Sequence, residues 1–252
     1  MTTAVIGVFE YQWVAFRRVW RSSVTMSFIL PLLTILGFGV GVGAYVPSVE
    51  GLPYLSFVVA GLLASTAMQT AVGDATWPVL DAFIWNRLHY AQAAAPPSPA
   101  DIAVGRLLYI VSRVMIPVVV FLAVAYAFGV PRSVWALASV PVCAALAWAT
   151  VGPCMALSAA VDSDLQLNLL YRLVVLPMTL FSGVFFPVEQ LPEALRWLSF
   201  VFPLWHGVDL CRVAMLGVDP SWPVWAHLTV LVAWGVAGTW VMVRVFARRL
   251  VQ

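Results

Sequence analysis

The sequence contains no lysine: all thirteen basic residues among its 252 are arginines. A P-loop needs a lysine that reaches the β- and γ-phosphates of the nucleotide, and Schiff-base chemistry needs a lysine amine. Both are therefore excluded from this chain. If the protein takes part in ATP-driven work, another chain must hydrolyse the ATP.

Charged residues of either sign are scarce, at 10% of the chain, whereas hydrophobic residues make up 63% and the mean hydropathy is +0.96. A soluble globular domain is about a quarter charged and about half apolar. The composition therefore indicates an integral membrane protein. The net charge of +2 is too small to indicate nucleic-acid binding, so no nucleic-acid partner is expected.

Residues that bind metals or act as nucleophiles are also few, with three histidines and three cysteines. The sequence has no H-E-x-x-H, no Cys/His pattern at metal-ligand spacing and no G-x-S-x-G. Cys143 and Cys154 lie about 16 Å apart on one predicted helix, too far for a disulfide, and Cys211 has no obvious partner. We expect no catalytic residue, no metal and no cofactor bound to this chain.

Six apolar stretches are long enough, at about 20 residues or more, to cross a bilayer as helices. They cover residues 22–46, 53–77, 99–128, 134–161, 165–186 and 222–243. Ser98, Pro99 and Asp101 occupy the cap, first-turn and third positions of the third stretch, an acidic form of the capping box. The predicted fold class is an all-α membrane protein with six transmembrane helices in a single domain over residues 1–252.

Residues 1–21 do not form a signal peptide, since no basic region precedes the apolar residues and no cleavage site follows them. Aromatic residues share one helical face there: Phe9, Trp13, Phe16 and Trp20. With arginines off that face, this predicts a helix lying in the membrane interface, and a packed amphipathic helix is the alternative. Within the first span, Gly39 and Gly43 form a small-xxx-small pair that would permit a dimer seam.

The arginines beside the spans divide unequally between the two sides of the membrane. The side that holds both termini carries Arg17, Arg18, Arg21, Arg87, Arg106, Arg172, Arg244, Arg248 and Arg249, and the other side carries Arg132, Arg196 and Arg212. The positive-inside rule then places both termini and the loop at residues 80–98 in the cytoplasm. The arginine-only, alanine-rich composition suggests a bacterial source, so we expect a multi-pass protein of the bacterial cytoplasmic membrane.

Residues 187–217 lie on the external side and cannot cross the membrane by themselves. Their uncharged core, Trp197–Val208, has only 12 residues; Pro187, Pro192 and Pro203 interrupt the region, and Pro177 lies shortly before it. Short broken helices at membrane depth need protein or a water-filled cavity to cover their backbone. We therefore predict an external re-entrant helical hairpin between spans five and six.

Two motifs in this region carry a resemblance to a known family. An F-S-G-x-x-F-P-x-x-x-L-P run begins at Phe181, and a P-L-x-H-x-x-D-L-x-R run extends from Pro203 to Arg212. Together they resemble the end of ABC-2-type exporter permeases, nearest to the lipo-oligosaccharide (nodulation factor) exporters and close to drug-resistance permeases. The resemblance implies a transport subunit rather than an enzyme. It also implies two partner ATPase subunits that bind ATP and Mg²⁺, and a second membrane subunit, identical or paralogous.

The same resemblance implies that the cytoplasmic loop at residues 80–98 carries a coupling helix that docks on the ATPase subunit. The helix maps to residues 81–95, and the residues expected to couple are Asp81, Arg87, Leu88 and Tyr90. A solvated connector is the alternative. It does not explain why the run from Leu88 to Ala95 is apolar and helix-forming.

On the external side, His206, Asp209 and Arg212 are spaced three residues apart and so share one helical face. With Phe181, Phe185 and Phe186 they are candidates for an external gate or a substrate contact. The alternative is a structural cap that satisfies the backbone of the broken helix.

Arg113 is the one charge well inside a predicted span, where charge is costly and faces a cavity or a partner. Asp74 and Asp81 on the neighbouring span are its candidate partners. Either a structural ion pair or a substrate site would account for it.

We therefore expect an ATP-driven exporter subunit that moves an amphipathic or lipid-linked substrate (a glycolipid, a lipo-oligosaccharide or a drug) out of the cytoplasm or inner leaflet, in contact with membrane lipids. A six-span secondary transporter is an alternative, but it predicts internal repeats and several intramembrane charges, and neither is present. A membrane enzyme acting on polyprenyl lipids is another. It predicts paired carboxylates or a metal site, and Asp162 and Asp164 are the only close acidic pair.

Overall fold

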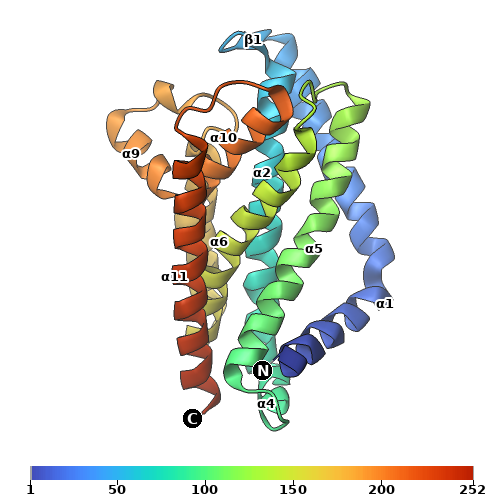
Figure 1. Cartoon of the computed structure of the whole chain (residues 1–252), viewed down its shortest axis with the longest axis vertical. Coiled ribbons are helices and arrows are strands. Elements are labelled where there is room, and N and C mark those ends of the chain that lie inside the picture. Colours follow the sequence, from blue (N-terminus) through green and yellow to red (C-terminus); the bar gives the residue numbers. More distant parts are fainter. Residues whose placement is uncertain (1, 252) are drawn as a thin grey trace.

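The computed structural model describes residues 2–251, with side chains at all of these positions except 2, 19, 21–28, 30, 31, 39 and 40. The described chain is mostly helical (Figure 1). Four helical stretches in it are long and apolar enough to cross a membrane: Tyr54–Ile84, Pro99–Ala127, Ala136–Ala160 and Val224–Leu250. Two further apolar stretches, Leu32–Ala44 and Leu165–Phe181, are shorter. The structure therefore confirms a helical protein with membrane-length helices, and the count of six spans stays a prediction.

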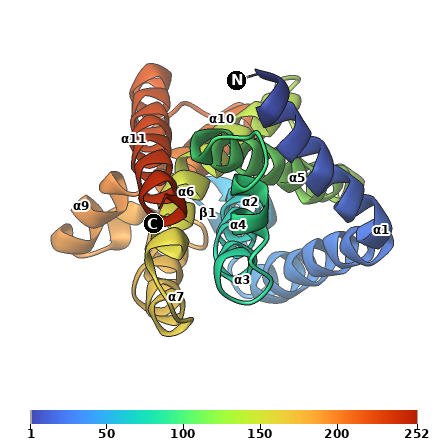
Figure 2. The ribbon, with the colours of Figure 1, turned by 90° about the horizontal axis from the view of Figure 1, so that it is seen from below.

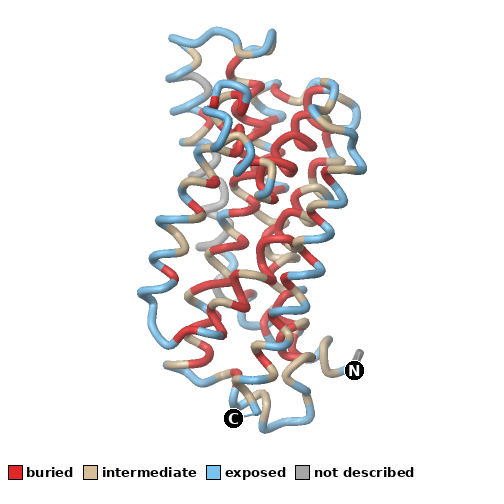
Figure 3. Tube along the Cα trace, turned by 90° about the vertical axis from the view of Figure 1, so that its left-hand side faces the viewer, coloured by how far each residue is buried: buried red, intermediate tan, exposed pale blue. Residues whose placement is uncertain are grey.

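Helix α2 (Tyr54–Ala75) is the centre of the bundle. Its side chains are apolar on nearly every face, as expected of a helix that neighbours cover all round, and Phe57, Leu63 and Met68 are fully buried. Helices α5 (Pro99–Ala127), α6 (Ser139–Ala160) and α10 (Pro203–Leu216) pack around it. Buried residues accordingly run along the length of the bundle (Figure 3).

Helices α6 and α11 (Val224–Leu250) pack most closely of all, because glycines face each other at their crossing. A Cβ atom added to Gly238 would lie 2.3 Å from Cδ of Pro153, and one added to Gly152 would lie 2.7 Å from the Gly238 backbone. Beside this crossing, the indole Nε1 of Trp148 donates to Oγ1 of Thr239 at 3.0 Å. This seam holds the two helices together as one unit.

Two short helices, α3 (Trp77–Ile84) and α4 (Leu88–Ala93), connect α2 to α5. The predicted capping box at the start of α5 is confirmed. The Ser98 hydroxyl accepts from the Asp101 N–H at 3.2 Å, and the Asp101 carboxylate accepts from the Ser98 N–H at 3.0 Å. The residue types at this boundary therefore fix where the third membrane helix begins.

Helix α1 (Thr2–Thr34) continues through a π-helical segment, Ile35–Gly41, and a 3₁₀ turn, Val42–Ala44, so the described part of the predicted interfacial helix, residues 2–21, is not a separate helix. Its first part lies across the lower end of α5, and the chain then bends upward (Figures 1 and 2). Phe16 is buried, and the Trp13 ring packs edge-on against Tyr109 of α5. The aromatic face predicted to lie on the membrane interface therefore packs partly on protein. The predicted Gly39–Gly43 seam lies outside the described residues, because Gly39 is not described.

At the opposite end of the bundle, the chain forms two short strands that an all-α prediction does not contain. Strands β1 (Ser48–Val49) and β2 (Leu52–Pro53) pair antiparallel, with Val49 opposite Leu52. Glu50 and Gly51 between them have φ values of 52° and 75°, which is the backbone of a tight primed hairpin turn. The prediction missed the hairpin because two-residue strands leave no alternating pattern to detect.

The fifth predicted span is a broken helix, made of α7 (Leu165–Leu170), a π-helical segment (Tyr171–Val175) and α8 (Leu176–Phe181). A 3₁₀ turn (Val188–Gln190), α9 (Glu193–Val201) and α10 follow it. Both chain ends and α4 lie at one end of the molecule, whereas β1, α9 and α10 lie toward the other (Figure 1).

Cys211 does have a neighbour, contrary to the sequence-based expectation. Its Sγ lies 3.8 Å from Sγ of Cys143, and both cysteines are free thiols buried between α10 and α6. The two are 68 residues apart in sequence, so only the tertiary structure could show the pair.

Candidate functional site

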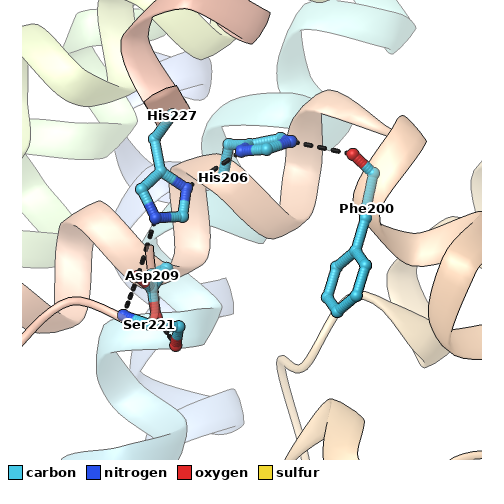
Figure 4. A network of polar contacts seen from close by, with 5 residues as sticks. All are labelled: Phe200, His206, Asp209, Ser221 and His227. Carbon is cyan, nitrogen blue, oxygen red and sulfur yellow. Dashed lines mark hydrogen bonds and ion pairs between the residues drawn. The ribbon is translucent and has the colours of Figure 1, made fainter. Parts of the chain in front are cut away.

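The end of the bundle opposite the chain termini holds a network of polar side chains centred on α10 (Figures 1 and 4). His206 is fully buried, and both of its ring nitrogens have partners. Nδ1 lies 2.9 Å from Nδ1 of His227 on α11, and Nε2 lies 2.9 Å from the carbonyl oxygen of Phe200 on α9. One imidazole therefore joins three helices.

Burial lowers the pKa of His206 to about 4, so its ring is neutral at pH 7 and carries a single N–H. A carbonyl oxygen can only accept, so that N–H is on Nε2 and donates to Phe200. Nδ1 of His206 must then accept, and the Nδ1–H of His227 donates to it. This one backbone contact therefore fixes the tautomer of His206 and requires a proton on Nδ1 of His227.

Asp209 continues the network one turn further along α10. Its carboxylate accepts from the Ser221 N–H at 3.0 Å and from the Ser221 hydroxyl at 2.7 Å. Nε2 of His227 lies 3.1 Å from the same carboxylate, within ion-pair distance but outside the angular range of a hydrogen bond. Although Asp209 is largely desolvated, these contacts hold its pKa below the usual value. The carboxylate thus fixes the loop between α10 and α11.

Arg212 occupies the last part of α10 and ties it to the loop that follows α8. Its Nη2 donates to the carbonyl oxygen of Gly183, and its guanidinium lies 3.7 Å from the centre of the Phe57 ring on α2. Gly183 has a φ of 77°, which a residue with a side chain rarely adopts, and an added Cβ would also crowd Val188 at 3.2 Å. This explains why the F-S-G run requires glycine at that position.

Two cavities open at this end. One of about 130 Å³ is lined by charged residues from four segments: Glu50, Glu189, Asp209, Arg212 and Asp219. The other, of about 470 Å³, lies between the β-hairpin region and the loop at residues 185–190, and Tyr54, Phe185 and Phe186 are among its lining residues. Phe181 and Phe186 also pack on a small buried cluster made of Val188, Leu191 and Trp205. This end therefore offers one charged cavity and one larger cavity whose lining is both polar and aromatic.

At the end that holds the termini, helices α3 and α4 form an exposed loop with a cavity of about 540 Å³ lined by Phe83, Ile84, Arg87 and Tyr90. The Trp85 side chain is 63% exposed and that of Tyr90 is 39% exposed. Large aromatic surface in water is unusual unless a partner covers it. Arg87 lies in the left-handed region with a φ of 50°, and Asn86 accepts from the Leu88 N–H at 3.0 Å, so the turn between the helices is well defined.

Beneath this loop, aromatic contacts attach it to the end of α11. His89 is fully buried between the rings of Phe83 and Phe246, at centroid distances of 4.7 and 5.4 Å. Arg249 stacks over Phe83 at 4.7 Å and donates to the carbonyl oxygens of Ala159 and Val161, the last ones of α6. The exposed loop is therefore fastened to the lower ends of both α6 and α11.

Comparison with known proteins decides the family. Residues 3–216 match the sequence profile described as ABC-2 type transporter. The chain belongs to the ABC-2 type transporter family. It is 28% identical over 247 residues to Nodulation protein J of Sinorhizobium fredii, with 98% of this chain and 94% of that protein covered. It is 28% identical over 245 residues to Nodulation protein J of Rhizobium meliloti, with 97% and 93% covered. It is 24% identical over 207 residues to the inner membrane transport permease YadH of Escherichia coli, with 81% and 79% covered.

In this ABC-2 protein, the predicted external residues lie close together but do not form one exposed face. His206 is enclosed by His227 and Phe200, whereas Asp209 and Arg212 line the charged cavity. Phe185 contacts Phe38 at a ring distance of 4.8 Å and lines the larger cavity. Among the six candidates, the cavities thus single out Phe185, Phe186, Asp209 and Arg212 as those within reach of a ligand.

The predicted intramembrane charge, Arg113, forms an ion pair with Asp74 of α2, and its guanidinium also lies 5.6 Å from the Phe16 ring. Of the two candidate partners, the structure selects Asp74. Sequence reasoning gave no role to Ser221 or His227, and it counted Arg106 and Arg249 only as flanking charges, although Arg106 is buried and Arg249 contacts the end of α6. Only their positions in the fold reveal these four residues.

Proposed function

We propose that this chain is the membrane subunit of an ATP-driven exporter whose ATPase is a separate chain. Membership of the ABC-2 family carries the proposal. The absence of lysine supports it, since no P-loop can be built from this sequence. The complete transporter would contain two ATPase subunits, which bind the ATP and Mg²⁺, and a second membrane subunit, identical or paralogous.

The chain would lie in the bacterial cytoplasmic membrane with both termini in the cytoplasm. Six spans would cross the bilayer, with the stretches Leu32–Ala44 and Leu165–Phe181 completing the set, and α9 and α10 would form the external re-entrant hairpin. Two observations support this orientation: the excess of arginine at the end that holds the termini, and the position of both termini beside α4.

The exposed loop formed by α3 and α4 would be the surface on which the ATPase subunit docks. Its exposed Trp85 and Tyr90 and the cavity beside Arg87 supply apolar contact area next to a positive charge. Such aromatic and arginine residues are typical of the energetic centre of protein interfaces. Asp81 and Leu88 would complete the coupling surface.

A co-purification experiment tests this assignment. Arg87→Glu, and Leu88→Glu with Tyr90→Glu, should detach the ATPase subunit while the membrane protein still purifies as a folded species. A matched control is Val134→Glu, an exposed residue at the opposite end of the molecule, which should leave co-purification unchanged. Wild-type retention of the ATPase and wild-type transport in the loop variants would refute the docking surface.

The cargo would be amphipathic: a glycolipid, a lipo-oligosaccharide or an amphipathic drug. The external end supports this, because a cavity of about 470 Å³ with aromatic residues in its lining lies next to a charged one of about 130 Å³. An acyl or aromatic part could lie against Phe185 and Phe186, and a headgroup could meet Asp209 and Arg212. Stimulation of ATPase activity in the reconstituted complex, by amphipathic compounds and by small hydrophilic solutes in parallel, tests this. Stimulation by the hydrophilic solutes alone would contradict the proposed cargo.

A further inference from the structure

The chain breaks between α2 and α3, at Thr76, whose φ of −104° and ψ of −97° are not helical. Pro78 in the first turn of α3 cannot continue the α2 ladder, because proline has no N–H. The groups freed at the break are nevertheless satisfied. The Thr76 hydroxyl donates to the carbonyl oxygen of Val72 at 2.8 Å, and the Ser158 hydroxyl of α6 donates to that of Ala75 at 3.0 Å. The break is therefore a built feature, and α3 is a separate segment that can tilt relative to α2.

Arg106 of α5 lies close to this break and is only 6% exposed. In the part of the chain that the structure describes, it has no hydrogen bond or ion pair, and its Nε is enclosed without a partner. A buried guanidinium without a partner is strongly unfavourable, so a group able to pair with Arg106 is expected nearby. The question is which group supplies that partner.

Two carboxylates on either side of the break act on Arg106 electrostatically: Asp74 on α2 and Asp81 on α3. Asp74 is already engaged by Arg113. Asp81 is only partly buried and is held by the side-chain amide of Asn86, a neutral group in the exposed turn before α4. Asp81 is therefore the carboxylate that is free to exchange partners, and it lies on the segment that can move.

We propose that Arg106 is a positioning residue for transport: tilting of α3 about Thr76 brings Asp81 into an ion pair with Arg106 in one state of the cycle and withdraws it in the other. This deepens the proposed function, because α3 belongs to the surface on which the ATPase would dock. A movement imposed by the ATPase on the loop would be converted into a choice of ion pair beside α2 and α5. The structure described here is the unpaired state.

A double-mutant cycle on the complete complex tests the pairing. Arg106→Gln and Asp81→Asn should each lower transport per ATP hydrolysed by about tenfold, within the usual range for coupling between sites. The double variant should be no worse than either single one, because both remove the same interaction. Arg106→Lys, which keeps the charge, should recover part of the loss. Co-purification of the ATPase subunit should stay at the wild-type level in Arg106→Gln.

A distance measurement keeps the proposal testable where Arg106→Gln does not assemble. Spin labels at two exposed positions, Trp85→Cys on the α3 side and Leu108→Cys on α5, should report a change in separation when ATP is trapped on the wild-type background. Additive losses in the double variant, or a separation that ATP does not change, would overturn the inference. If the wild-type protein retains no ATPase subunit at all, the proposed function itself fails, and this outcome is distinct from the other two.

Discussion

Arg212 offers the sharpest test of how the end of the bundle around α10 is held together. The variant Arg212→Met keeps most of the side-chain volume but removes the donor to the Gly183 carbonyl and the cation above the Phe57 ring. A hydrogen bond from a charged group contributes about 1.5–3 kcal/mol. A desolvated cation–π contact contributes about 2 kcal/mol. These two terms share one guanidinium and are not additive.

An opposing term must be weighed, because methionine has no charge to desolvate and replacement of buried ions can be neutral or even stabilising. Here the saved desolvation energy is offset, because Arg212 is the positive charge that faces Glu50, Glu189 and Asp209. Without it, these three carboxylates would repel one another. We therefore expect a net loss of about 2 kcal/mol in the free energy of unfolding. For a chain of this length that corresponds to a fall of roughly 4–8 °C in the melting temperature.

The assay combines melting in detergent with the reactivity of a cysteine introduced at Val188, which packs under Gly183 and is 3% exposed. Arg212→Met should lower the melting temperature and speed the labelling of Val188→Cys. The matched control, Arg132→Met, changes an exposed arginine on the same side and should alter stability by no more than about 0.5 kcal/mol. If Arg212→Met melts like the wild type and leaves Val188→Cys protected, the anchoring role of the guanidinium is wrong.

Three further predictions concern other parts of the molecule. Gly238→Ala should lower the free energy of unfolding by about 1–3 kcal/mol, because the added Cβ would overlap α6. The control Gly7→Ala, which has open space around it, should leave the stability unchanged. Equal melting temperatures for the two variants would refute the close packing of α6 against α11. Burial lowers the pKa of His89 to about 3, below the unfolded value near 6.5. The stability of the folded protein should therefore be greatest above about pH 6.5 and should fall as the pH is lowered toward 3, because the unfolded chain then binds a proton that the folded chain does not. His89→Phe should flatten this pH profile, and an unchanged profile would contradict it. Impermeant thiol reagents added outside cells should label Asp219→Cys but not Arg248→Cys, and the reverse pattern would overturn the proposed orientation.

Sequence reasoning succeeded where local chemistry decides the structure. The capping box at Ser98 and Asp101 fixed the start of α5, because both partners lie within one helical turn. The long apolar stretches indicated membrane helices, because the bilayer imposes a minimum length. The F-S-G and P-L-x-H runs indicated the family, and the structure shows that they meet where Arg212 contacts Gly183.

Contacts between distant segments escaped sequence reasoning for a physical reason. Spacing along a helix placed His206, Asp209 and Arg212 on one face, but it could not show that His227, 21 residues after His206, would enclose the first of them. Likewise, Arg106 looked like a flanking charge, because α5 begins only a few residues before it. Its burial depends on how distant helices pack around α5, which no local pattern encodes.

The α6–α11 unit connects the two functional ends of the molecule. At the end that holds the termini, Arg249 of α11 donates to the carbonyl oxygens of Ala159 and Val161, where α6 ends, and stacks on Phe83 of α3. At the opposite end, His227 of the same helix contacts both His206 and Asp209. Between these ends the glycine seam leaves no room for the two helices to slide separately. We therefore expect movement of the loop formed by α3 and α4 to reach α10 through a rigid α6–α11 pair. A substitution that loosens the glycine crossing of these two helices should then weaken the coupling between ATP hydrolysis and transport before it abolishes either activity.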